Sequence, residues 1–253
     1  MKIAAFLQLY NELEKGNLVR CLENCKKWAD EIFIYDDCST DNSKDVYLKY
    51  TDKDKIIFGK TREFNKEIYH KQQLLELTLT SSPDWIVWQD GDAILDRQLT
   101  NNLKSILQDL DNKGVDGAYV HYLNLWRSNS YHRVDNSYDL GWFLLLWKNT
   151  GALYYEPKKG LHLDQFPLGI KNPIKIPHTV VHYGFSTKEK IENKYLTYKS
   201  YGQHGHSLER LIDEQSSFNL VKMDVNSYPE ENVPTNYDTE VKPLPISFKE
   251  VRK

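Results

Sequence analysis

The chain has 253 residues, a formal net charge of −3 at pH 7, 40% hydrophobic and 27% charged residues, which describes one large globular domain or a domain with an appendage. Lysine and arginine are scattered and no apolar run approaches the roughly 18–20 residues of a membrane span, which argues against nucleic acid, an anionic membrane surface or a membrane span. The three cysteines give no disulfide framework, so we expect a reducing, cytoplasmic setting.

The first 114 residues alternate between apolar runs typical of strands and segments with helical periodicity. The start resembles a signal peptide briefly, but it turns polar at Gln8 and acidic at Glu12, so we expect a strand there. The predicted elements are strand 2–10, helix 11–30, strand 31–37, helix 38–50, strand 55–59, helix 65–79, strand 84–92 and helix 96–114. This alternation predicts an α/β fold with a mostly parallel, doubly wound sheet, which binds ligands beyond the carboxyl ends of its strands.

The second half of the chain changes character. Residues 117–126 and 141–149 are typical of strands joined by a polar loop, and residues 186–202 predict a capped helix. Beyond roughly residue 220, Pro, Asn, Glu and Val alternate without a period. We expect a poorly packed tail there, or one that wraps over the surface.

Acidic residues follow three of the four predicted strands of the first half. Glu12 follows the first strand, Asp36 and Asp37 end the second, and Asp90 and Asp92 end the fourth. Loops are generally polar, so a single acidic residue after a strand would not indicate a function. Alternate residues of a strand point to the same side, so Asp90 and Asp92 can present two carboxylates to one partner. Because close like charges repel and raise a pKa, a cation is the obvious candidate.

Three of these strand ends resemble glycosyltransferase family 2. They read "LYNE" (9–12), "YDDCSTDNS" (35–43) and "QDGDAIL" (89–95), and the resemblance covers about residues 2–120. The Asp-Asp-x-Ser-x-Asp-x-Ser pattern is fairly specific after a strand, whereas an Asp-x-Asp pair alone occurs often by chance. The resemblance implies a GT-A-like fold. Residues 1–115 would form a nucleotide-sugar-binding half, 116–206 an acceptor-side α+β half of the same domain, and 207–253 a C-terminal extension or surface-wrapping tail.

The resemblance also implies a chemistry. The enzyme would move a sugar from a nucleotide-diphosphate donor, with a UDP-sugar favoured, to a hydroxyl acceptor such as a glycan, with inversion. Breaking the donor's glycosidic bond puts charge on the diphosphate, which Mn²⁺ or Mg²⁺ held by carboxylates can neutralise. Asp92 would be the direct metal ligand, and Asp90 would face the ribose or the metal.

Further residues acquire roles around the nucleotide by the same resemblance. Asn11 and Glu12 would line the nucleotide pocket. Asp37, with Asp36 beside it, would hold the base or ribose. Lys60 and Arg62 would contact the base or the phosphates. For Lys60 and Arg62, a solvated loop is an equally good interpretation.

An inverting transfer also needs a base near the acceptor hydroxyl. Family 2 enzymes usually carry an acid for this in a Glu-Asp pair, and no such pair stands in residues 140–170, so the sequence departs from the pattern. Asp164 in "HLDQFP" is the first candidate, although it can equally cap a turn, and Asp139 in "SYDLGW" is the second. His182 lies in a segment that resembles one where a His completes the metal shell, although a His ending an apolar strand is more often structural.

Two other functions stay open. A haloacid-dehalogenase-like phosphatase also ends an apolar strand in Asp-x-Asp, but on its first strand and usually with Thr or Val next, whereas Ala93 follows here. A catalytically inactive protein that binds sugar nucleotides would fit the missing acidic pair.

Overall fold

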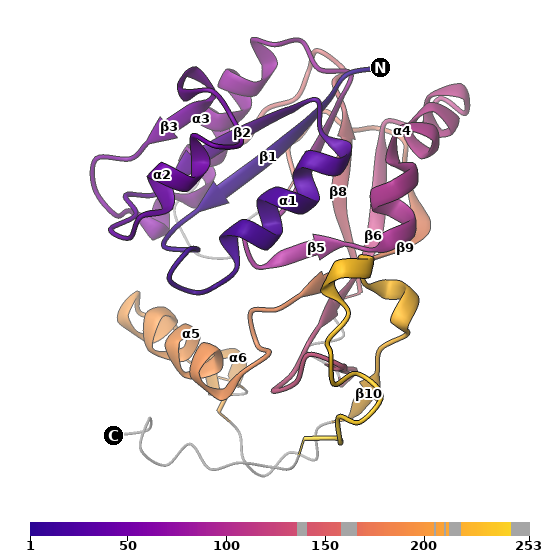
Figure 1. The fold of residues 1–253 in the computed structure, drawn as a ribbon. Coiled ribbons are helices and arrows are strands. Elements are labelled where there is room, and N and C mark those ends of the chain that lie inside the picture. Colours follow the sequence, from indigo (N-terminus) through magenta and orange to yellow (C-terminus); the bar gives the residue numbers. More distant parts are fainter. Residues whose placement is uncertain (136–140, 158–165, 205, 210, 213–218, 244–253) are drawn as a thin grey trace.

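The computed structural model describes residues 1–135, 141–157, 166–204, 206–209, 211–212 and 219–243 (Figure 1). No helix in this part of the chain combines the length and the apolar character that a membrane crossing requires.

A mixed sheet of eight strands forms the centre of the described structure, in the order β3-β2-β1-β4-β8-β6-β9-β5. Its strands are β1 (Ile3–Leu9), β2 (Glu31–Asp36), β3 (Ile56–Phe58), β4 (Trp85–Trp88), β5 (Ala93–Leu95), β6 (Gly117–Asn124), β8 (Trp142–Lys148) and β9 (Pro173–His182). The first four are parallel neighbours, β6 and β9 are also parallel, and β8 and β5 join antiparallel. The mostly parallel α/β sheet predicted from the sequence is confirmed.

The helices are α1 (Leu18–Trp28), α2 (Ser43–Tyr47), α3 (Glu67–Leu79), α4 (Arg97–Asn112), α5 (Lys188–Ser200) and α6 (His206–Glu209), with 3₁₀ turns η1 (Lys53–Lys55), η2 (Phe64–Lys66), η3 (Val225–Ser227) and η4 (Glu230–Asn232). Helix α4 begins where the Asp96 carboxylate accepts a hydrogen bond from Leu99 N at 2.7 Å. Its buried leucines recur at helical spacing and form one apolar stripe, which packs on the sheet beside α1 (Figure 1).

Helices α1 and α3 cover opposite faces of the sheet. Lys71 of α3 lies over the ring of Trp88, 4.0 Å from its centroid. The next residue, Gln89, contacts Cys21 of α1. Because neighbouring residues of an extended chain point to opposite sides, the two helices sandwich β4.

The C-terminal segment packs against the rest of the chain. Its strand β10 (Leu220–Lys222) pairs antiparallel with β7 (Tyr131–Arg133). Met223 and Tyr228 are buried, and η3 lies against α4 and β9, as the yellow segment of Figure 1 shows. Of the two expectations for this segment, poor packing is wrong for residues 220–228, whereas none of residues 231–243 is buried.

Candidate active site

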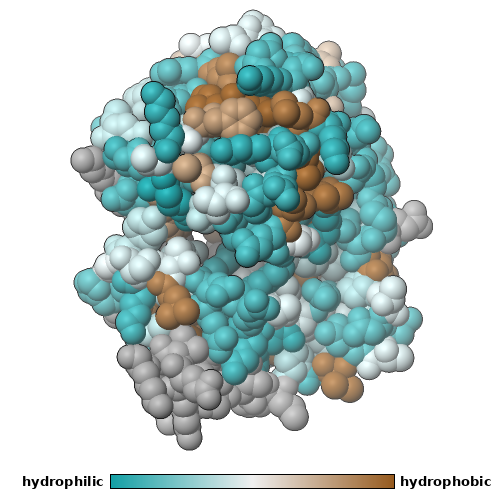
Figure 2. Space-filling model, turned by 60° about the vertical axis from the view of Figure 1, so that its left-hand side comes forward, coloured by the Kyte–Doolittle hydropathy of each residue, from teal (hydrophilic) through white to brown (hydrophobic). Residues whose placement is uncertain are grey.

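A cavity of about 400 Å³ lies at the carboxyl ends of β1, β2 and β4, between them and α5. Figure 2 shows the surface hollowed near its centre, among mostly hydrophilic side chains. The predicted site residues that line this cavity are Glu12, Asp37, Arg62, Asp90, Asp92 and His182. The sheet brings residues from five separate stretches of sequence to one place.

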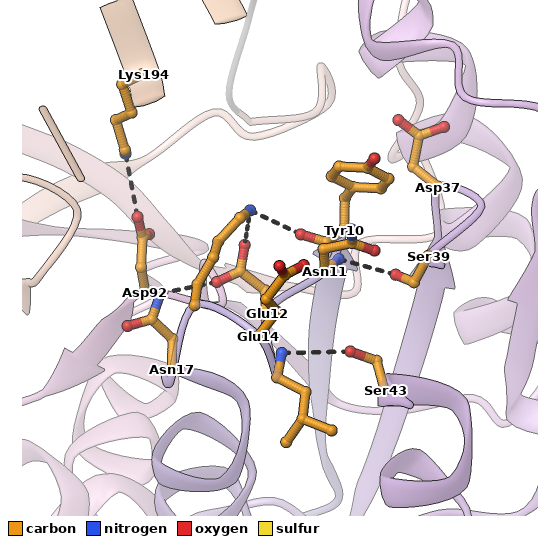
Figure 3. Close-up of polar contacts among 12 residues, drawn as sticks. Tyr10, Asn11, Glu12, Glu14, Asn17, Asp37, Ser39, Ser43, Asp92 and Lys194 are labelled. Atoms are coloured by element: carbon orange, nitrogen blue, oxygen red, sulfur yellow. Dashed lines mark hydrogen bonds and ion pairs between the residues drawn. The ribbon is translucent and has the colours of Figure 1, made fainter. Parts of the chain in front are cut away.

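Other predicted residues lie elsewhere. Asn11 is tied to the loop after β2, since its side-chain oxygen accepts from Thr40 N at 2.8 Å. Its backbone N–H donates to Ser39 Oγ at 2.9 Å (Figure 3). Lys60 is exposed on the loop after β3. Neither lines the cavity. Asp139 and Asp164, the predicted bases, lie outside the described residues.

Asp36 has a structural task instead of a place in the cavity. Its side chain is buried, and its carboxylate accepts hydrogen bonds from Ser39 N at 3.0 Å and from Tyr47 OH at 3.1 Å. The adjacent Asp37 points the other way, into the cavity. The carboxylate of Asp36 therefore holds the loop after β2 against α2.

We expect Asp36→Ala to destabilise the fold. Its removal leaves the buried Tyr47 hydroxyl and Ser39 N–H without their acceptor, so unfolding in urea should require about 2–3 kcal/mol less. Tyr47→Phe, which removes only one of the two bonds, should cost about half as much. Equal stability of Asp36→Ala and the parent chain would contradict this assignment.

Aromatic and charged groups gather at the β2 end of the cavity. The Arg62 guanidinium lies 3.3 Å from the centroid of the Tyr10 ring and 5.2 Å from that of Phe64. Its Nε is 3.5 Å from Asp37 Oδ2, and Asp37 Oδ1 accepts from Glu63 N at 3.0 Å. Burial raises the pKa of Asp37, and these contacts only partly oppose it. A flat group entering here meets a ring, a planar cation and a buried acceptor.

His70 of α3 lies behind this end of the cavity, and the sequence predicted only that it belongs to a helix. Its ring stacks on Tyr35 with centroids 4.2 Å apart, and Nδ1 lies 3.1 Å from Gln8 Nε2. Burial lowers the pKa of His70 to about 4. The imidazole is therefore neutral at pH 7, and Nδ1 accepts the hydrogen bond that Gln8 donates.

The loop after β1 forms the floor of the cavity. Glu12 is bound on one side by Lys15 Nζ at 2.7 Å and on the other by Asn17 Nδ2 at 2.9 Å (Figure 3). A Cβ on Gly91, the residue between the two aspartates that follow β4, would lie 2.6 Å from Glu12 Cγ and 2.8 Å from Leu9 Cδ2. The glycine therefore lets the Asp-Gly-Asp turn lie directly on the β1 loop.

Asp90 and Asp92 have different partners. Asp90 Oδ2 accepts a hydrogen bond from Tyr122 OH of β6 at 2.7 Å. Burial raises the pKa of Asp90, and the nearby charge of Asp92 raises it further. No sequence motif marks Tyr122 as a site residue. It reaches Asp90 from β6. The protein groups that contact Asp90 therefore differ from those that contact Asp92.

Asp92, His182 and Lys194 form a close cluster at the α5 end of the cavity. His182 Nε2 is 3.2 Å from Asp92 Oδ2, and Lys194 Nζ is 3.1 Å from the same oxygen (Figure 3 shows Lys194 above Asp92). Pairing of β5 with β9 places His182 opposite Ala93, which brings it beside Asp92. Burial favours the neutral acid, but His182 and Lys194 outweigh it and hold the pKa of Asp92 well below its usual value.

Asp92 and His182 fit a divalent cation. Their facing atoms are 3.2 Å apart, close to the roughly 3 Å between adjacent ligands of an octahedral ion. His182 Nδ1 lies 2.6 Å from Asn124 Oδ1, which fixes the ring and leaves Nε2 as the ligand atom. A Cβ on Gly184 would fill the space in front of both atoms, at 2.5 Å from each. No third acidic, histidine or cysteine ligand joins them among the described residues.

The comparisons with known proteins agree with this architecture. Glycosyl transferase family 2 matches residues 6–180. No curated protein sequence gives a match. Among solved structures, S. aureus TarS is similar over 83% of this chain and 41% of its own, with 13% identity and a TM-score of 0.50.

A second structure, residues 1–349 of TarS in complex with UDP-GlcNAc, is similar over 83% of this chain and 69% of its own, with 12% identity and a TM-score of 0.51. This chain spans less than half of the longer TarS chain, and likeness at this identity shows a shared fold. The family match shows more than a shared fold, because it covers most of the chain, including β2 and β4 and the carboxyl-terminal part of β1. The resemblance seen in the strand ends is thereby confirmed, and the chain belongs to glycosyl transferase family 2.

Proposed function

We propose that the protein transfers a sugar from a UDP-sugar to a hydroxyl group of an acceptor, with a divalent cation at the diphosphate and with inversion. The observation that carries this proposal is the order of groups along one cavity. A stacking and accepting end at Tyr10, Arg62 and Asp37 is joined to a cation-binding end at Asp92 and His182. Membership of family 2 supports it, as does the fold shared with a TarS fragment that binds UDP-GlcNAc.

The β2 end suits a pyrimidine base. A uracil ring offers a flat face and one ring N–H, and Asp37 offers a buried acceptor within a few ångströms of the Tyr10–Arg62 stack. Arg62 lies on the Tyr10 ring, so we expect it to move aside or to cover the base when the donor binds. Lys60, on the exposed loop nearby, is a weaker candidate for a phosphate contact.

The α5 end suits the diphosphate. Mn²⁺ or Mg²⁺ held by Asp92 and His182 would neutralise charge on the leaving group. Lys190 and Lys194 are one helical turn apart on α5 and both line the cavity. Their ammonium groups add positive charge on the side from which the phosphates enter. Asp90, bound by Tyr122, would face the ribose.

We expect the acceptor to bind on the side of the cavity formed by β6, β8 and β9. Tyr122, Phe143 and Phe185 line the cavity there and offer apolar faces of the kind that sugars stack on. Inversion requires a base opposite the leaving group, for which we retain Asp164 and Asp139 as candidates. We propose a glycan as acceptor.

Binding of UDP, GDP, CDP and dTDP, measured by calorimetry with Mn²⁺ and with EDTA, tests the proposal. UDP should bind tightest, and removal of the metal should weaken it by about 10-fold or more, within the usual range of coupling between two ligands. Asp37→Ala should weaken UDP binding in both buffers. Preference for another base would change the donor class, and binding without any donor hydrolysis or transfer would identify a protein without turnover.

A further inference from the structure

The position between Asp92 and His182 is already filled by a cation of the chain itself. Lys194 Nζ lies 3.1 Å from Asp92 Oδ2 and 3.3 Å from His182 Nε2, so one ammonium donates to both atoms. These are the same two atoms that fit a divalent cation. The ammonium and the metal ion therefore have the same partners.

The surroundings of Gly184 indicate that the ammonium and the metal ion would also occupy the same space. A Cβ there would lie 2.3 Å from Lys194 Nζ, and 2.5 Å from both Asp92 Oδ2 and His182 Nε2. The backbone of Gly184 thus closes one side of a small enclosure whose other walls are the carboxylate and the imidazole. An enclosure in which a single methyl group clashes with all three atoms has no room for an ammonium and a metal ion together.

Lys194 can leave this position. Its side chain is 26% exposed, and it extends from α5 past the ring of Phe185, 4.7 Å from the centroid. A lysine reaches its partner through a flexible four-carbon stem, so a small rotation moves the ammonium into the cavity. Asp92 and His182 have no such freedom, because β5 and β9 are paired and Asn124 holds the ring of His182.

We propose that Lys194 and a divalent cation exclude each other from one position, so that Lys194 holds the empty site together and weakens metal binding until a diphosphate arrives. The second half rests on the proposed function, because the diphosphate supplies new acceptors for the displaced ammonium. Metal and donor would then bind together, each raising the affinity for the other.

Mn²⁺ binding without nucleotide, followed by electron paramagnetic resonance and calorimetry, tests the exclusion. Lys194→Met keeps the aliphatic stem and removes the ammonium, and should bind Mn²⁺ about 10-fold more tightly than the wild type. Lys190→Met is the matched control. It removes the same charge from the same face of α5, but its ammonium lies on Asn17 Oδ1 at 3.0 Å, so we expect a change of no more than about twofold. Asp92→Asn combined with Lys194→Met should lose the gain.

A Lys194→Met protein that binds Mn²⁺ no more tightly than the wild type overturns the proposal, and so does an equal gain in Lys190→Met. Lys194→Gln serves as a second variant, judged by the same criterion, if the Met variant unfolds. The proposed function is judged separately by UDP binding to the same samples, because the Mn²⁺ comparison needs no nucleotide. With UDP present, the increase in Mn²⁺ affinity should be larger in the wild type than in Lys194→Met.

Discussion

Asp92→Ala is expected to reduce sugar transfer by about 1000-fold while the chain stays folded. The Asp92 carboxylate contacts both His182 and Lys194, so its loss removes the anionic half of the cation position. Under the proposed function, charge on the departing diphosphate would then have neither a bound metal ion nor a correctly placed ammonium nearby. Its side chain is 15% exposed at the cavity wall, and no core packing depends on it.

The measurement compares UDP release in the presence of acceptor with thermal unfolding of the same sample. Asp84→Asn is a suitable control, because Asp84 precedes the other end of β4, far along the strand from the cavity, and is 55% exposed. It should transfer at the wild-type rate. Wild-type activity in Asp92→Ala would remove the central claim about this site.

The parallel half of the sheet was readable from the sequence because each strand is a continuous apolar run and each helix has a buried stripe. The carboxyl-end rule then pointed to the correct edge. It was harder to predict from the sequence which side of a strand each residue faces. Asp36 and Asp37 look alike in the motif, yet one turns inward to Tyr47 and the other faces the cavity. A shift of one residue in the predicted strand exchanges their roles.

The sequence indicated the α5 end of the site less clearly. Strand β5 has only three residues, which is too short for a period, and its pairing with β9 is what brings His182 to Asp92. Lys194 lies on a helix with charged residues on most sides, so its sequence does not distinguish it from a solvated lysine. The burial of Tyr228 could not be predicted either, because it lies in an irregular segment that packs through single side chains and has no periodic apolar pattern.

Gly184→Ala is expected to lower both Mn²⁺ affinity and transfer by about 100-fold. The added methyl would lie 2.5 Å from Asp92 Oδ2 and from His182 Nε2. Lys194 can withdraw from it, but the two ligand atoms are held by the β5–β9 pairing. Because Gly184 has no positive φ, alanine strains no backbone there, and the damage should be confined to the cation position.

Gly151→Ala gives the opposite pattern and is the control. Gly151 lies in a turn after β8 with φ of 73° and with nothing near its missing Cβ, so alanine should cost roughly 1–2 kcal/mol of stability and leave transfer unchanged. Lys194→Met added to Gly184→Ala should not restore Mn²⁺ binding, because two of the three close contacts remain. If Gly184→Ala instead keeps wild-type affinity and rate, the space between Asp92 and His182 holds no cation during turnover, and the diphosphate must be stabilised from the lysines of α5 alone.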